Sequence, residues 1–322
     1  MKILLVTDAW PPQINGVAHT LSYITGLIRK EHDITVLTPY VEGSETLPLR
    51  IHNIPIVTNA ADLAERHFDT YSPDRVHIAT EGPLGLAARQ LCRKNGIAYN
   101  TSYHTRLADY GWLLYRVPAF LTWAYIRWFH MCSRKVLVTT RSITRQLGLS
   151  NCLVWGRGVD TGLFYPESGE KTIISVGRVS KDKNLDDFCT IRGYRKILVG
   201  GGPHLDTLRA KYPDVEFTGP VPHGELRRMY ARADVFVFPS RLDTFGLVIL
   251  EAMACGLPVA AYDVPSPSDI VKHGVTGYIG NNLEECVENA FGNLGNVSTG
   301  ALEYAKAQSW DSIAEQFVNH LE

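Results

Sequence analysis

One pattern repeats along most of the chain: a short apolar run rich in valine, isoleucine and leucine, followed by a segment of helix length. Because the runs are continuously apolar, they are typical of strands covered on both faces, as in parallel sheets. The runs cover residues 3–7, 34–38, 76–80, 97–103 and 136–140, and then 172–176, 196–200, 215–219, 235–239 and 258–262. This alternation predicts an α/β fold.

Two sets of runs in 322 residues predict two doubly wound, Rossmann-like domains, residues 1–160 and 161–322. The stretch 156–171 is rich in glycine and charge, as a connection between domains should be. We expect the last helix, from about residue 309, to cross back to the first domain. Ligands bind beyond the carboxyl ends of such strands, so we expect a site in a cleft between the domains.

Charge and cysteine content argue against several kinds of partner. The 32 basic and 33 acidic residues give a net charge of −1, so no overall field attracts nucleic acid or an anionic membrane. The six cysteines lack the spacing of metal or redox pairs and are typical of reduced thiols in a cytoplasmic protein. The opening MKILLVTDAWPP predicts a strand rather than a signal peptide, and no apolar run predicts a transmembrane span.

Glu251 is a single charge within a long apolar stretch. Gly246 and Gly256 mark the ends of a predicted helix, and Pro258 lies just beyond it. Since the other side chains from 247 to 255 are apolar, we expect a helix buried on most sides and a carboxylate that needs partners. Either a structural salt bridge or the hydroxyls of a bound sugar would satisfy it.

Neighbouring features predict an anion site beside Glu251. The turn into its helix consists of Asp243, Thr244, Phe245 and Gly246. Backbone N–H groups and the positive end of a helix dipole attract anions there. Arg178 follows the run at 172–176, Lys183 comes five residues later, and a glycine turn around Gly201 follows the next run. Each feature alone also suits a solvated loop, but together they favour a phosphate.

In this order, these residues resemble the donor domain of family 4 retaining glycosyltransferases. The resemblance covers nearly the whole chain and is greatest to bacterial glycolipid mannosyl-, glucosyl- and sulfoquinovosyltransferases. The other matching segments are NGV (15–17), EGPLGLAAR (81–89), SYHT (102–105), RWFH (127–130), GRGVDTGLF (156–164) and SWDSIAEQF (309–317). One departure is Asp243, which stands where the paired acidic motif of the family has its first glutamate.

The resemblance implies the two-Rossmann GT-B architecture, with a nucleotide diphosphate sugar held by the second domain. Glu251 would bind the ribose hydroxyls, and Asp243 with the backbone of 244–247 would hold the donor sugar and diphosphate. Arg178 and Lys183 would neutralise the charge that builds on the diphosphate as the glycosidic bond breaks. Because the chain contains no Asp-x-Asp sequence, we expect a metal-independent reaction without a cofactor, and the resemblance implies that it retains the configuration of the sugar.

By the same resemblance, Gly201 would pass close to the nucleotide, and Gly16 of the first domain would lie near the diphosphate. Asn15 and Val17 would contribute to the acceptor side; a simple Asn-Gly turn is the alternative interpretation of this segment. His104, at the end of a predicted strand, would lie near the donor sugar and phosphate, although a lone histidine is often structural.

The segment 110–130 is dense in aromatic residues, with Arg116 and Arg127 between them. It predicts either contact with a membrane surface and a lipid acceptor, or a helix that packs on its own sheet. Such residues also stack on unpaired bases, but a nearly neutral chain does not favour a nucleic-acid acceptor.

The sequence thus predicts a cytoplasmic or peripheral membrane glycosyltransferase that moves a hexose from a nucleotide diphosphate sugar to a lipid or carbohydrate hydroxyl. GDP-mannose and UDP-glucose both fit, and UDP-sulfoquinovose and UDP-glucuronate stay open as donors. One alternative is a non-hydrolysing sugar-nucleotide epimerase, which the lack of further paired carboxylates does not favour. Another is a non-enzymatic sugar-binding protein, in which the phosphate-binding cations would have no purpose.

Overall fold

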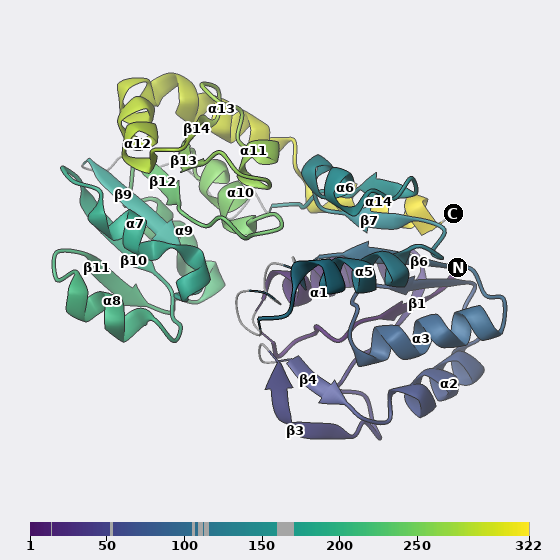
Figure 1. Ribbon diagram of the computed structural model, residues 1–322. Helices are drawn as coiled ribbons and strands as arrows, with labels where there is room; N and C mark the ends of the chain where they lie inside the picture. Colours follow the sequence, from purple (N-terminus) through teal and green to yellow (C-terminus); the bar gives the residue numbers. More distant parts are fainter. Residues whose placement is uncertain are drawn as a thin grey trace. The chain divides into compact units, whose positions relative to one another are not determined.

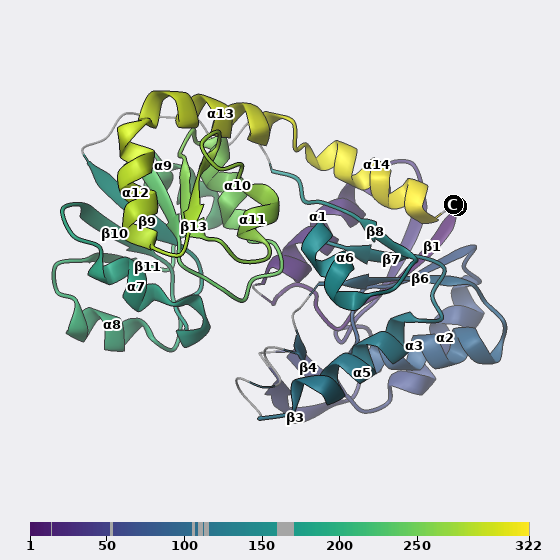
Figure 2. The ribbon, with the colours of Figure 1, turned by 45° about the horizontal axis from the view of Figure 1, so that its top comes forward.

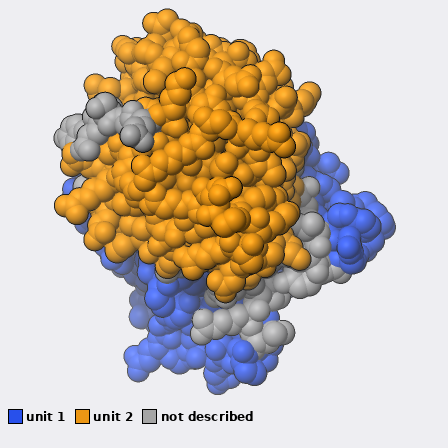
Figure 3. Space-filling view, turned by 90° about the vertical axis from the view of Figure 1, so that its left-hand side faces the viewer, with its two compact units in different colours: residues 1–157, 311–322 blue, residues 158–310 orange. Residues whose placement is uncertain are grey.

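The computed structural model describes residues 1–13, 15–51, 54–104, 107–108, 112, 116–159 and 171–321. The chain divides into two compact units, coloured separately in Figure 3: residues 1–157 with 311–322, and residues 158–310. The division comes after Arg157, slightly before the boundary predicted at residue 160, which itself lies outside the described residues.

The first unit is built on a parallel sheet with the strand order β2-β1-β5-β6-β7-β8 (Figure 1). Its strands are β1 (Lys2–Val6), β2 (Asp33–Leu37), β5 (Arg75–Ile78), β6 (Tyr99–Tyr103), β7 (Val136–Val138) and β8 (Cys152–Val154). A separate antiparallel hairpin joins β3 (Thr46–Ile51) to β4 (Ile54–Val57). All five apolar runs predicted for this domain form strands, whereas β3, β4 and β8 were not predicted.

Helices cover both faces of this sheet. They are α1 (Gly16–Ile28), α2 (Ala60–Tyr71), α3 (Pro83–Lys94), α5 (Ala119–His130), α6 (Arg141–Leu147) and α14 (Trp310–Leu321). Val76 and Ile78 of β5 pack in the cluster that contains α2 and α3. His77 lies between them in the strand and so faces the opposite side, where its ring meets the edge of Phe317 of α14 at a centroid distance of 4.7 Å.

Hydrogen bonds fasten α14 to the first unit, although the second unit precedes it in the chain (Figure 2). The indole N–H of Trp155 donates to the carbonyl of Ile313 at 3.0 Å. The amide of Asn100 donates to the carbonyl of His320 at 2.7 Å. These backbone acceptors lie at the start and end of α14, so the helix is held along its length.

The second unit repeats the design with the strand order β11-β10-β9-β12-β13-β14, again parallel. Its strands are β9 (Thr172–Val176), β10 (Arg195–Val199), β11 (Glu216–Gly219), β12 (Val235–Phe238), β13 (Val259–Tyr262) and β14 (Gly277–Gly280). The five predicted runs are again strands, and β14 is an addition. Both units are therefore doubly wound Rossmann-like domains, as predicted.

Alternate residues of the second sheet enter separate cores. Ile174 and Val176 of β9 pack with residues of α10 and α13, whereas Ile173 packs with residues of α7 and α12. Because strand side chains alternate between faces, these helices lie on opposite sides of the sheet. The helices are α7 (Leu185–Thr190), α8 (Leu205–Lys211), α9 (Leu226–Tyr230), α10 (Leu247–Ala254), α11 (Pro267–Ile270), α12 (Leu283–Gly292) and α13 (Leu294–Lys306).

Candidate functional site

The sheet of the second unit reverses its strand order between β9 and β12, which pair through Ile173 and Val235. From β9 the chain runs outward through β10 to β11, and from β12 it runs the other way through β13 to β14. Doubly wound sheets bind ligands beyond the strand ends at such a reversal. Arg178 and Lys183 follow β9, and Asp243 follows β12, so the fold brings these predicted residues to that point.

An ion pair connects the two sides of this reversal. The Lys183 ammonium donates to Asp243 Oδ1 at 2.6 Å, and each side chain is 20% exposed. Asp182 Oδ2 lies 3.8 Å from the same ammonium. Among the described residues, the second oxygen of Asp243, Oδ2, is buried and has no hydrogen-bond partner. A buried acceptor without a donor is costly, so this oxygen is suited to a ligand hydroxyl.

Arg178 is exposed on the segment that leaves β9. The glycine turn after β10 runs beside this segment, where the Val179 N–H donates to the Gly201 carbonyl at 2.9 Å. A Cβ at Gly200 would lie 1.8 Å from the carbonyl oxygen of Gly177, so the close approach requires glycine. The glycine turn thus supports the backbone that carries Arg178, and the contact of Gly201 with a nucleotide stays a prediction.

The turn into α10 has no side chain at its cap. Gly246 is the N-cap residue with φ +81°, and a Cβ there would lie 2.9 Å from Phe238 Cζ, so glycine is favoured for both reasons. The carbonyl of the preceding Phe245 accepts from the Ser266 hydroxyl at 2.7 Å. Because Gly246 has no side chain with which to cap the helix, the N–H groups of the first turn, which begins at Leu247, are suited to an anion. Thr244 lies partly exposed between this turn and Asp243.

Glu251 lies in the middle of α10 and is 8% exposed. Its Oε2 accepts from the Tyr230 hydroxyl at 3.0 Å, and its Oε1 lies 3.9 Å from Nδ1 of His223. Burial raises the pKa of Glu251, and His223 and Tyr230 oppose that rise. Among the described residues, the partner for a salt bridge with Glu251 is His223, and its distance is longer than a hydrogen bond. Oε1 is therefore suited to accept a hydrogen bond from a ligand.

In the first unit, His104 follows β6 at the carboxyl edge of the sheet and is 4% exposed. Its Nδ1 accepts a hydrogen bond from Nη2 of Arg157 at 2.7 Å. The imidazole also meets the ring of Trp155 edge-on, with the centroids 5.9 Å apart. Burial, followed by the charge of Arg157, lowers the pKa of His104 well below its ordinary value. The predicted histidine is therefore neutral at physiological pH.

The Asn-Gly-Val segment begins α1. Asn15 is the N-cap residue, and its Oδ1 accepts from the Ala18 N–H at 2.8 Å. Gly16 and Val17 are the first residues of the helix. The side chain of Asn15 therefore has a structural task, since caps of this kind satisfy otherwise unpaired N–H groups. The placement of Gly16 near a diphosphate and of Asn15 and Val17 near an acceptor stays a prediction.

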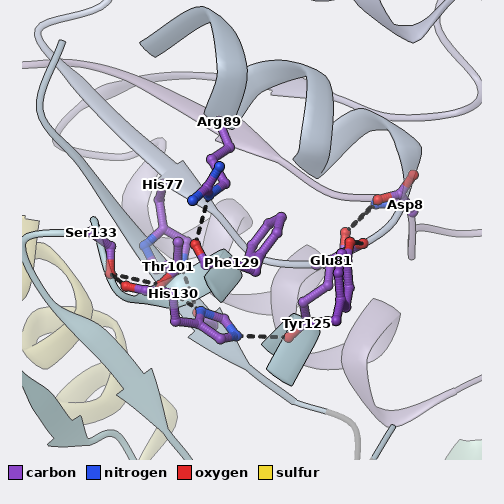
Figure 4. Close-up of polar contacts among 11 residues, drawn as sticks. Asp8, His77, Glu81, Arg89, Thr101, Tyr125, Phe129, His130 and Ser133 are labelled. Carbon is purple, nitrogen blue, oxygen red and sulfur yellow. Dashed lines mark hydrogen bonds and ion pairs between the residues drawn. The ribbon is translucent and has the colours of Figure 1, made fainter. Parts of the chain in front are cut away.

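A buried polar network follows β1 and β5, where the first sheet reverses its strand order (Figure 4). Asp8 accepts from the Thr80 hydroxyl at 2.7 Å and from the Leu84 N–H at 3.0 Å, and burial raises its pKa. A Cβ at Gly82 would lie 2.5 Å from the carboxyl carbon of Asp8. The carboxyl group of Asp8 thus occupies the N-terminus of α3, a position that holds phosphate in other doubly wound domains.

The same network anchors α5 (Figure 4). His130 Nε2 lies 3.1 Å from Glu81 Oε1, and His130 Nδ1 forms a hydrogen bond of 2.8 Å with the Thr101 hydroxyl. The Tyr125 hydroxyl donates to the backbone carbonyl of Glu81 at 2.6 Å. Arg89 donates to carbonyls in the last turn of the helix. Residues 81–89 and 127–130, which the family resemblance singled out, therefore hold α5 to the domain.

The outer face of α5 is exposed and largely apolar. Its exposed large apolar side chains are Phe120 (71%), Leu121 (51%) and Trp128 (41%), Met131 (60%) follows at the C-cap, and Arg127 is exposed as well. The inner face is buried through Ile126, Phe129 and His130. The described part of segment 110–130 thus packs on its own domain and also presents an apolar surface; residues 110, 111 and 113–115 lie outside the described residues.

Within the described part of the chain, no three His, Cys, Asp or Glu side chains gather closely enough to hold a metal ion. None of the described helices has the length and apolar character needed to cross a membrane. Metal independence and the site of action in the cell stay predictions.

Tyr230 and Arg157 contact predicted site residues without having been predicted themselves. Tyr230 is the last residue of the short helix α9, and the sequence around it is typical of ordinary core packing. Arg157 lies between two glycines in the GRGVDTGLF segment. The sequence alone did not reveal that this residue is buried, at 4% exposure. An arginine between two glycines was the available signal.

Comparison with protein-family models gives two matches. The model described as "Glycosyltransferase Family 4" matches residues 15–163, and the model "Glycosyl transferases group 1" matches residues 165–285. A solved structure of sucrose-phosphate synthase from Thermosynechococcus elongatus has a TM-score of 0.82, with 18% identity over 99% of this chain and 98% of the other. That likeness concerns the fold, which is the GT-B glycosyltransferase fold.

Curated relatives agree with these models. A GDP-mannose-dependent alpha-mannosyltransferase of Corynebacterium glutamicum is 26% identical over 99% of this chain and 88% of its own length. An alpha-monoglucosyldiacylglycerol synthase of Streptococcus pneumoniae is 26% identical over 86% of this chain and 74% of its own length. Since the two family models together cover most of the sequence, the chain belongs to the family 4 glycosyltransferases.

Proposed function

We propose that this glycosyltransferase moves a hexose from a nucleoside diphosphate sugar, of the GDP-mannose or UDP-glucose type, to a hydroxyl of a lipid or glycan, with retention and without a metal ion. The observation that carries the proposal is the Lys183–Asp243 pair at the strand reversal of the second unit. It places a cation and an incompletely satisfied carboxylate where such sheets bind nucleotides.

The second unit offers complementary groups for each part of this donor. The diphosphate suits Arg178, Lys183 and the N-terminus of α10, where the cap residue is a glycine, because these groups concentrate positive charge. The buried Oδ2 of Asp243 suits a sugar hydroxyl, which can donate to it. Oε1 of Glu251 suits the ribose, since Tyr230 already satisfies Oε2.

The chemistry needs charge stabilisation more than a protein nucleophile. As the bond between the sugar C1 and the phosphate oxygen breaks, negative charge grows on the leaving diphosphate. Fixed cations and a helix N-terminus stabilise such charge. The acceptor oxygen forms the new bond on the same face of C1, and its proton passes to the departing phosphate oxygen. In this scheme Arg178 and Lys183 stabilise the charge on the leaving diphosphate, as a divalent cation does in metal-dependent glycosyltransferases.

The exposed apolar face of α5 supports a lipid acceptor at a membrane surface. Phe120, Leu121 and Met131 are more than half exposed, and such side chains insert at the boundary between headgroups and acyl chains. Arg127 extends over Trp123 at the same helix and adds a cation for anionic headgroups. The relative that makes a glucosyldiacylglycerol is consistent with an acceptor of this class.

Isothermal titration calorimetry in EDTA tests the donor assignment. GDP-mannose and UDP-glucose are titrated into the wild type, Glu251→Gln and the control Glu303→Gln, which alters an exposed glutamate of α13 in the same unit. We expect one nucleotide sugar to bind the wild type and the control equally and Glu251→Gln about tenfold more weakly, ~1.4 kcal/mol. Binding that requires a divalent cation, or that is indifferent to Glu251, contradicts the proposal. Epimerisation of the bound sugar without acceptor favours the epimerase instead.

A further inference from the structure

Ser266 has a backbone conformation that is costly for a residue with a side chain. It lies between Pro265 and Pro267, at the start of α11, with φ +88° and ψ −71°. These angles are those of a γ-turn with positive φ, which is rare and strained. In such a turn the third residue donates its N–H to the first, but Pro267 has no N–H to donate. A residue before proline also prefers extended backbone, so the local backbone does not compensate for the strain at Ser266.

A side-chain hydrogen bond offsets part of this cost. Ser266 is 1% exposed, and its hydroxyl donates to the backbone carbonyl of Phe245 at 2.7 Å. Because Phe245 directly precedes Gly246, the cap residue of α10, this contact joins the start of α11 to the turn that begins α10. Strained residues persist where the surrounding structure over-determines them, and they concentrate at functional sites. The strain at Ser266 therefore points to a task for this contact.

The contact with Phe245 determines the direction of the next N–H group. The peptide bond between Phe245 and Gly246 is trans, and the C=O and N–H of a planar trans unit point in opposite directions. When Ser266 holds the Phe245 carbonyl, the Gly246 N–H is directed away from Ser266. Among the residues that the structure describes, no acceptor is found for this N–H. It lies at the positive end of α10, where an anion is favoured.

A second contact holds the other end of the same loop. The guanidinium of Arg241 lies over the ring of Tyr262, 3.5 Å from the centroid. Tyr262 ends β13, and its hydroxyl donates to Oδ2 of Asp187 in α7 at 2.7 Å. Residues 241–245 are therefore attached at both ends to β13 and the segment that follows it, and Asp243 lies between the two attachments.

We propose that Ser266 is a positioning residue whose hydroxyl, through the Phe245 carbonyl, directs the Gly246 N–H toward the diphosphate of the donor. The proposal rests on the function proposed above, in which the diphosphate binds at the N-terminus of α10. All the residues involved belong to the second unit. Ser266 does not touch the donor in this scheme, and its hydroxyl acts through the orientation of one peptide unit.

Isothermal titration calorimetry of GDP and UDP in EDTA tests this role with two variants. Ser266→Ala and Ser266→Gly both lose the hydroxyl, but glycine adopts a positive φ without strain. We expect Ser266→Gly to have a thermal midpoint a few degrees above that of Ser266→Ala. Both should bind the nucleotide about tenfold more weakly than the wild type, as loss of one hydrogen bond to a charged group does. Ser268→Ala removes a hydroxyl bonded to Asp263 and Val264 and should bind like the wild type.

A purely structural role predicts a different order of affinities. Binding would then follow stability, so that Ser266→Gly restores the affinity that Ser266→Ala loses. That result, or wild-type affinity in both variants, overturns the proposal while the proposed function stands. If Ser266→Ala does not fold, Ser266→Gly alone decides, since it lacks the hydroxyl but not the fold. If neither GDP nor UDP binds the wild type, the proposed function fails, and the role of Ser266 fails with it.

Nuclear magnetic resonance of the Gly246 amide provides the direct readout. On saturation with the nucleotide that binds, we expect its proton resonance to move downfield in the wild type and in Ser268→Ala, because the N–H then donates to an anion. The movement should be smaller in Ser266→Ala and Ser266→Gly at the same saturation. A Gly246 resonance that does not move in the wild type, or that moves equally in all four proteins, contradicts the proposal.

Discussion

The hydroxyl of Tyr230 donates to Oε2 of Glu251 at 3.0 Å, and both side chains are buried. Tyr230→Phe removes this donor and leaves a buried carboxylate oxygen unsatisfied. We expect the free energy of unfolding to fall by about 1–3 kcal/mol, the usual cost of such a group. Urea denaturation measures the loss, and Tyr40→Phe at an exposed position provides the control. Equal stability of the two variants would show that Glu251 does not depend on Tyr230.

At neutral pH, Glu251 should lower the free energy of unfolding relative to an uncharged side chain at the same position. Burial raises its pKa in the folded state, so its contribution is fully present below the unfolded pKa, about 4.3, and is lost as pH rises through the folded value. Glu251→Gln should therefore gain stability relative to the wild type as pH rises from about 4 to 7. Urea denaturation along this pH series checks the sign; a relative loss across the series contradicts it.

Lys183 is expected to act in the reaction more than in the fold. Its pair with Asp243 is partly buried, with 20% exposure on each side, so Lys183→Met should leave the chain folded but lower the thermal midpoint, because Asp243 loses its partner. The same variant should lower kcat about 100-fold or more, because a fixed cation near the leaving group is lost. Lys181→Met, on the same turn and exposed, should retain wild-type kcat. Loss of folding in Lys183→Met alone would assign this pair to structure.

The first unit should lose stability in mild acid through His77. Burial, followed by the nearby His320, lowers the pKa of His77 to about 3. A histidine with a depressed folded pKa contributes stability that is present above its unfolded pKa, about 6.5, and is lost as pH falls toward the folded value. In His77→Gln, the thermal midpoint should fall less between about pH 7 and 5 than in the wild type and in the control His32→Gln. A slope identical to that of the wild type would exclude His77 as the titrating group.

The apolar face of α5 should mediate membrane binding. The double variant Phe120→Ser/Leu121→Ser removes two of its exposed side chains, so flotation with anionic phospholipid vesicles should fall severalfold while the thermal midpoint is retained. Leu47→Ser, at another exposed apolar position of the first unit, should float like the wild type. Equal flotation of all three proteins would place the lipid contact elsewhere.

Sequence reasoning identified the central strands of both sheets and two of the four edge strands, β2 and β11. It missed the other two edge strands: β14, which begins and ends with glycine, and β8, which is three residues long. The β3–β4 hairpin was also missed, since it lies outside the main sheets.

For the site, the order of strands and loops placed Arg178, Lys183 and Asp243 at one sheet edge, because carboxyl ends of parallel strands share an edge. What the sequence did not reveal was pairing across the fold. The Lys183–Asp243 contact joins residues 60 positions apart, and Arg157 reaches His104 over 53. No local pattern encodes such partners, since they depend on which strands become neighbours.

The placement of α14 has a consequence for synthesis. Residues 158–310 are an insertion within the first unit, between β8 and the helix that packs on His77 and Trp155. A ribosome therefore completes the whole of the inserted domain before it makes the segment that covers the first sheet. Domains generally fold as units during synthesis, so the inserted domain finishes first, while the domain that begins the chain waits without the helix that packs on His77 and Trp155 until residues 311–321 emerge.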